Sequence, residues 1–154
     1  MKKALALRVV AVVAMLLLAS TLSGCIASKL VMEVKEPLLV CTQNEPIVGT
    51  LVITAKGIAG GVYNKLIVEF KDGAGDVIEA ATQEANVQVF VSPFNSPVEV
   101  DISESVVAPV ELWDSEGNFQ AVTAKFTLPA PSTFLKTLTA EVDVGPVPPP
   151  SGLQ

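Results

Sequence analysis

The sequence predicts an all-β domain: an antiparallel β-sandwich, with a small β-barrel as the alternative. After residue 28, apolar runs recur at spacings of roughly 8–12 residues, and turn-forming residues separate them. Within several runs apolar and polar residues alternate, most clearly at Val98, Glu99, Val100, Asp101 and Ile102. A two-residue period places one face of a strand in a core and the other in water.

The strand pattern is found in these segments: residues 29–34, 37–41, 49–56, 65–71, 86–91, 97–103, 109–113, 119–128 and 136–144. Hairpin turns are expected at residues 72–76 and 114–118, because glycines there can take the positive φ that hairpin loops require. Pro109 places its strand at a sheet edge or at the start of the strand. Residues 78–85 are rich in Ala, Glu and Gln, so a short helix is an alternative there.

Residues 1–24 have the three zones of a secretory signal. A basic start, an uncharged apolar stretch and two small residues follow one another: Lys2, Lys3 and Arg8, then residues 9–22, then Ser23 and Gly24. The apolar stretch would span roughly 21 Å as a helix, which is short of the ~30 Å hydrocarbon core of a bilayer. Cleavage of this segment is therefore expected, in preference to an uncleaved transmembrane anchor.

Leu22-Ser23-Gly24-Cys25 resembles the lipobox of bacterial lipoproteins, in which Leu, a small residue, and Gly or Ala precede Cys. The resemblance implies that a diacylglyceryl group is joined to the Cys25 sulfur. It further implies that a signal peptidase cuts before Cys25 and that the new amino group can then be acylated, for example with palmitate. The alternative is an ordinary cut, for example after Ala27, with a disulfide between Cys25 and Cys41.

Lipid on Cys25 would leave Cys41 without a partner. Its apolar surroundings, residues 38–40, predict a buried small side chain in preference to a reactive thiol. Residues 25–28 would form a short tether to the membrane. By the resemblance, the absence of Asp after the cysteine points to the outer membrane if the cell is Gram-negative. In another cell type the protein would lie on the outer face of the cell membrane.

The expected organisation is a lipoprotein signal peptide (1–24), a tether (25–28), a β-sandwich domain (29–144) and a Pro-rich tail (145–154). The tail contains four prolines, which predict polyproline II or disorder. Residues 49–80 are similar to immunoglobulin-like (Ig-like) domains of the FxLYD type, although the Tyr-Asp pair of that pattern is missing. This similarity implies an Ig-like sandwich and carries no function.

Charge and composition exclude several classes of function. Without the leader, seven Lys and 16 acidic residues remain, so the mature net charge is 7 − 16 = −9. Such a body is expected to be repelled by nucleic acid and by anionic lipid headgroups, so neither is an expected partner of the body as a whole. The chain has no His, and its single Arg is in the leader, so neither a Ser-His-Asp triad nor a His-ligated metal is available. The expected function is a non-enzymatic binding or structural module with a protein partner in the envelope and no cofactor.

The alternative function is a carrier or sensor for a small ligand, either a lipid or a metal ion. Carboxylates offer two further interpretations: Glu99 and Asp101 share a strand face as a glycosidase pair would, and the turns offer oxygen ligands for calcium. The turn residues in question are Asp72 and Asp76, and Asp114, Glu116 and Asn118. Solvated strand faces and ordinary hairpin turns explain the same residues.

Two phenylalanines are candidates for a partner surface. If Val89 and Val91 face the core, Phe90 between them points outward, and Phe94 follows closely. An exposed aromatic pair would mark a partner patch. Cover by a loop or by a neighbouring strand is the alternative.

Overall fold

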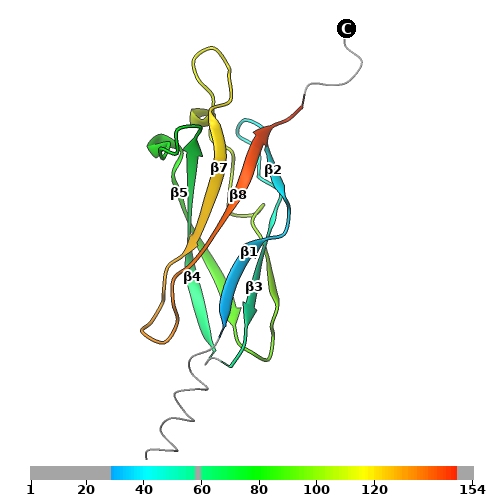
Figure 1. Cartoon of the computed structure of the whole chain (residues 1–154), viewed down its shortest axis with the longest axis vertical. Helices are drawn as coiled ribbons and strands as arrows, with labels where there is room; N and C mark the ends of the chain where they lie inside the picture. Colours follow the sequence, from blue (N-terminus) through cyan, green and yellow to red (C-terminus); the bar gives the residue numbers. More distant parts are fainter. Residues whose placement is uncertain (1–28, 58–59, 149–154) are drawn as a thin grey trace, which may run out of the picture.

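The computed structural model, described here for residues 29–57 and 60–148, confirms the all-β prediction. Two sheets pack against each other, and one of them curls into a half-barrel (Figure 1). The predicted signal peptide and tether lie outside the described residues. Among the residues that are described, no helix is long and apolar enough to cross a bilayer.

The smaller sheet has three antiparallel strands in the order β1-β3-β6. These strands are β1 (Leu30–Val34), β3 (Thr50–Ala55) and β6 (Val98–Asp101). In β3, Leu51, Ile53 and Ala55 are buried and alternate with half-buried residues, as the two-residue period predicts.

The larger sheet has five strands in the order β2-β8-β7-β4-β5. These are β2 (Leu38–Cys41), β8 (Leu138–Pro146), β7 (Ala121–Leu128), β4 (Gly61–Asp72) and β5 (Gln83–Val91). Four of the strands pair antiparallel, but β2 runs parallel to β8, with Leu38 opposite Asp143. The prediction of a purely antiparallel sandwich is therefore wrong at this edge. The alternation of apolar and polar residues in a strand determines which face of the strand is buried. It does not determine whether the adjacent strand runs parallel or antiparallel.

The core lies between the two sheets. Its largest fully buried side chains include Tyr63 and Phe70 from β4 and Phe126 from β7. The Tyr63 hydroxyl donates a hydrogen bond of 2.6 Å to the carbonyl oxygen of Lys136, in the β7–β8 loop. A buried phenol needs such a partner, so this bond fixes the loop against the start of β4.

The structure corrects the strand predicted at residues 109–113. A single 3₁₀ turn, η2 (Val110–Leu112), occupies it, and Trp113 makes an isolated bridge to Phe119. The N–H groups of Leu112 and Trp113 donate to carbonyls within the same turn, at 3.1 and 3.0 Å. These two N–H groups are therefore already hydrogen-bonded within the turn and do not pair with a neighbouring strand.

Two other boundaries also differ from the predictions. In residues 78–85, helix is limited to the 3₁₀ turn η1 (Glu79–Ala81), and β5 already begins at Gln83. At the other end of the domain, β8 continues through Gly145 to Pro146, two residues into the predicted tail. Pro146 is the last residue of β8 and lies opposite Cys41 of β2. Proline has no N–H to donate, but at the end of the strand this breaks no hydrogen bonds between later residues.

Candidate functional site

The predicted lipid-attachment residue Cys25 and the predicted processing residues Leu22, Ser23 and Gly24 lie outside the described residues. What the structure places is the start of the folded body, because β1 begins at Leu30, five positions after Cys25. Five extended residues span at most about 18 Å. The end of the sandwich at which β1 begins is therefore the part of the domain closest to Cys25 along the chain.

We call this the first-strand end and define it as Lys29 together with residues 56, 57 and 60 and the loops 92–97 and 129–137. Hydrogen bonds connect neighbouring parts of this end. The Lys56 N–H donates to the Lys29 carbonyl at 2.9 Å, and the Ala55 N–H donates to Ser96 Oγ at 2.9 Å. Figure 1 shows the β5–β6 and β7–β8 loops at the same end of the molecule as the start of β1.

A close approach between β4 and the β7–β8 loop closes this end. Leu135 is buried in that loop and packs directly over Gly61, where a Cβ would collide with the Leu135 side chain. Gly is thus required at position 61 for steric reasons. The loop that carries Phe134 is consequently held by Leu135 on one side and by the hydrogen bond from Tyr63 to Lys136 on the other.

Three phenylalanines at or near the first-strand end are exposed. The exposed fractions are 98% for Phe94, 79% for Phe134 and 54% for Phe90. Val89 and Val91 are buried, so the prediction that Phe90 points outward is confirmed. On the outer face of the larger sheet, Phe90 is opposite Val62, which is also exposed.

The loop that carries Phe94 is held by its own side chains. The Ser92 N–H donates to Asn95 Oδ1 at 2.7 Å, and Asn95 Nδ2 donates to the Phe90 carbonyl at 3.0 Å. The Phe94 N–H donates to Ser92 Oγ at 3.2 Å. Phe94 is therefore presented to solvent from a hydrogen-bonded turn.

Phe134 was missed by the sequence analysis. It lies in a loop between β7 and β8, where no strand period exists to predict which way a side chain points. The available signal was an isolated aromatic residue among Pro, Ser and Thr, in a stretch too polar to bury it.

Cys41 is a free, buried cysteine with 1% of its surface exposed, which confirms the expected buried small side chain. Burial raises the pKa of the Cys41 thiol from 9.0 to about 11. Leu30 lies beside the start of β8 and Cys41 is opposite Pro146 at its end, so β8 separates them by about 26 Å. A tether of at most about 18 Å from Leu30 is shorter than this separation, which disfavours the disulfide alternative.

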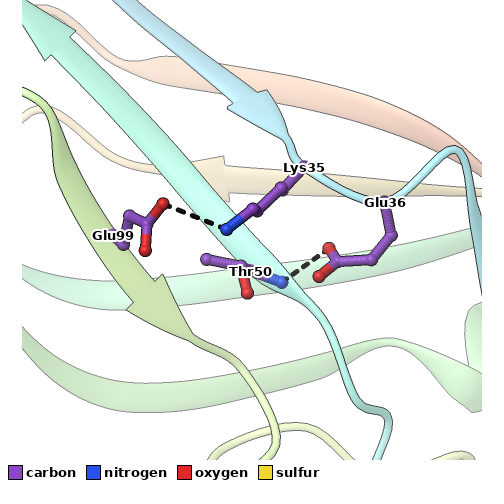
Figure 2. A network of polar contacts seen from close by, with 4 residues as sticks. All are labelled: Lys35, Glu36, Thr50 and Glu99. Atoms are coloured by element: carbon purple, nitrogen blue, oxygen red, sulfur yellow. Dashed lines mark hydrogen bonds and ion pairs between the residues drawn. The ribbon is translucent and has the colours of Figure 1, made fainter.

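The carboxylates of β6 have surface roles. Glu99 accepts a hydrogen bond of 3.3 Å from Lys35 Nζ, which reaches across β3, while neighbouring Glu36 accepts the N–H of Thr50 at 2.8 Å (Figure 2). Asp101 accepts the Ser103 N–H at 2.9 Å, and hydrogen bonds from Ser103 lower the pKa of its carboxyl. Both carboxylates are exposed and lie apart from the surface hollows described below, so nothing prepares them for glycoside cleavage.

The two predicted hairpin turns share one hydrogen-bond pattern. Asp72 Oδ1 accepts the N–H groups of Ala74 and Asp76 at 2.9 and 3.0 Å. Asp114 Oδ1 accepts the N–H groups of Glu116 and Asn118, both at 2.9 Å. These bonds, from Asn118 first, lower the pKa of the Asp114 carboxyl. The first oxygen of each Asp thus organises its own turn, as hairpin chemistry requires.

No group of three or more His, Cys, Asp or Glu residues within 29–57 and 60–148 is arranged to hold a metal ion. Three surface hollows are present, of about 360, 290 and 200 Å³. They lie beside the β1–β2 link, beside Cys41, and between β1 and the start of β8. None of the three is lined by the large core side chains Tyr63, Phe70 and Phe126, as an apolar ligand cavity between the sheets would be.

The fourth residue of each hairpin turn, 72–76 and 114–118, is constrained by its backbone: Gly75 has φ 86° and Gly117 has φ 84°. We predict that Gly75→Ala lowers the free energy of unfolding by about 1–2 kcal/mol, because a Cβ is disfavoured in the left-handed region. Gly73→Ala in the same turn is the matched control, since the added Cβ would meet only Val122, at 3.8 Å. Urea unfolding of both variants tests this, and equal effects would contradict it.

Comparisons with protein-family models, curated proteins and solved structures found no match to this chain. Its candidate functional residues are therefore those that its own sequence and geometry single out. They are the lipobox-like segment ending at Cys25 and the exposed phenylalanines of the nearby first-strand end.

Proposed function

We propose that this protein is a bacterial lipoprotein, exported and anchored in a membrane of the cell envelope by lipid on Cys25. Its folded body acts there as a non-enzymatic binding or structural module with a protein partner. The observation that carries the proposal is Leu22-Ser23-Gly24-Cys25, placed at the end of the uncharged apolar stretch 9–22, with Cys25 five positions before the first strand.

The strand order supports an Ig-like module. Lettering the strands in chain order as in Ig domains, β1-β3-β6 corresponds to A-B-E and β8-β7-β4-β5 to G-F-C-C′. Strand β2 adds to the G edge in parallel, and no strand corresponds to D in the described part of the chain. The strand order is an argument about the fold only. An argument about function has to rest on the residues exposed at the surface.

The surface supports a binding or structural role. Among the catalytic and calcium-binding candidates, Asp72, Asp101 and Asp114 accept backbone N–H groups within their own turns, and Glu99 pairs with Lys35, as structural residues do. By contrast, Phe90 and Phe94 expose apolar surface that nothing in the described part of the chain covers. Exposed apolar surface of this kind is typical of interaction sites.

Replacing the predicted anchor residue tests the proposal. In cells supplied with a clickable palmitate analogue, Cys25→Ala should abolish labelling and either release the domain from the membrane fraction or leave an unprocessed precursor. The physical reason is that the sulfur of Cys25 is the attachment point and that two or three acyl chains are needed for firm anchoring.

Cys41→Ala is the matched control, because it makes the same change at the other cysteine of the chain. It should retain both the label and the membrane fractionation of the wild type. Loss of label in both variants, or retention in both, would contradict attachment at Cys25.

A further inference from the structure

The two ends of the sandwich differ sharply in charge. The segments that form the first-strand end, residues 56, 57 and 60 and the loops 92–97 and 129–137, contain no Asp or Glu. They carry Lys56 and Lys136, and Lys29 lies beside them; all three lysines are exposed. For a body with a net charge of −9, an end without acidic residues is a marked asymmetry.

The opposite end, where β4 ends and β7 begins, has the reverse composition. Segments 72–82 and 110–120 contain no Lys or Arg and hold these acidic residues: Asp72, Asp76, Glu79, Glu111, Asp114 and Glu116. Figure 1 shows these turns at the end of the molecule remote from the start of β1. An anionic surface would therefore repel this end and tolerate the other.

Exposed aromatic side chains coincide with the lysine-bearing end. Phe94 and Phe134 are 98% and 79% exposed, on two different loops of the first-strand end. Both loops are held in place, by the Ser92 and Asn95 hydrogen bonds and by the bond from Tyr63 to Lys136. Phe flanked by Lys on a polar surface is the composition of segments that lie in the membrane interface.

We propose that the first-strand end rests on the bilayer, with Phe94 and Phe134 inserted into the interfacial layer and Lys29, Lys56 and Lys136 facing anionic headgroups. This inference rests on the proposed function, because the bilayer in question is the one that holds the lipid of Cys25. The tether of at most about 18 Å brings this end, and no other, within reach of that surface.

The charges favour lipid over a protein as the occupant of this surface. Three lysines without an acidic neighbour in the loops match the negative potential of anionic lipids. The position of the surface, directly after the predicted anchor, makes contact with the bilayer nearly intramolecular. The acidic turns and the outer face around Phe90 then remain free for a partner in the envelope.

Tryptophan quenching in vesicles tests the inference with a built-in control. The one Trp of the chain, Trp113, directly follows η2 in the acidic segment 110–120 and should report no contact with lipid. The full-length gene would be expressed and processed in cells, and the mature protein reconstituted into vesicles of phosphatidylcholine and phosphatidylglycerol with brominated acyl chains. Phe94→Trp and Phe134→Trp each add a reporter at an exposed position, where the change does not disturb the core.

The new Trp emission should fall by about half or more in brominated vesicles and shift to shorter wavelength, because interfacial side chains lie within ~10 Å of the acyl chains. The Trp113 emission of the wild-type protein should stay unchanged. If the vesicles float with the protein but neither reporter is quenched, the inference fails while the anchor stands. That result would assign the phenylalanines to a protein partner.

If the mature protein does not float with vesicles, the anchor itself fails, and the inference fails with it. If the wild-type Trp113 is quenched as strongly as the reporters, the acidic end meets the membrane and the proposed orientation is wrong. Flotation thus tests the lipid anchor, and the positions at which Trp emission is quenched test the orientation of the domain on the bilayer.

Discussion

Replacing Phe126 by Ala should lower the free energy of unfolding by about 3–5 kcal/mol, the cost of removing a large side chain from a packed core. Phe126 is fully buried in β7, opposite Val68 of β4 and Ala140 of β8. The space it leaves is bounded on both sides by hydrogen-bonded strands, which limits collapse into the cavity. Urea unfolding of the chain from residue 26 onward, followed by Trp113 fluorescence, measures the change.

Phe134→Ala is the matched control, since the same side chain is removed from a 79% exposed position. Its effect should stay within about 0.5 kcal/mol. If Phe126→Ala does not fold, Phe126→Leu gives a measurable step of about 1–2 kcal/mol. Equal losses at the two positions would contradict the assignment of Phe126 to the core and of Phe134 to the surface.

Alkylation of Cys41 by iodoacetamide at pH 8 should be at least about 100-fold slower in the folded chain than in urea. Burial raises the pKa of this thiol from 9.0 to about 11, so the reactive thiolate is about 100-fold rarer. In the chain from residue 26 onward Cys41 is the single cysteine, so intact mass reports its labelling directly. Labelling at similar rates with and without urea would show that the thiol is accessible.

The same pKa shift sets a pH dependence of stability. The folded state favours the neutral form of the Cys41 thiol. Below pH 9 this thiol is also neutral in the unfolded chain, so its burial does not lower the free energy of unfolding there. As pH rises from 9 towards 11, the unfolded chain ionises first and the free energy of unfolding declines, by up to about 2–3 kcal/mol. Cys41→Ala should remove this decline.

The strands that alternate clearly were predictable from the sequence. Val98, Val100 and Ile102 defined β6, and the alternation in residues 119–128 defined β7, because a two-residue period has one physical interpretation. The parallel pairing of β2 with β8 was not predictable. It depends on which edges meet after the sheets have packed, and no local pattern records that.

Turn segments were harder to predict than strands. At residues 109–113 the apolar residues resemble a strand, yet Pro109 starts a 3₁₀ turn whose N–H groups bond locally. Of the surface phenylalanines, Phe90 followed from the alternation of β5, whereas Phe134 in a loop had no period to place it. The grouping of Phe94, Phe134 and three lysines at one end required the topology.

Intact-mass measurement of the protein extracted from membranes tests the central claim, attachment of lipid at Cys25, most directly. The account predicts a chain that begins at Cys25 and carries the mass of a diacylglyceryl group, with or without a further acyl chain. A chain that begins at Ile26 or later without acyl mass, or one that retains residues 1–24, would contradict it.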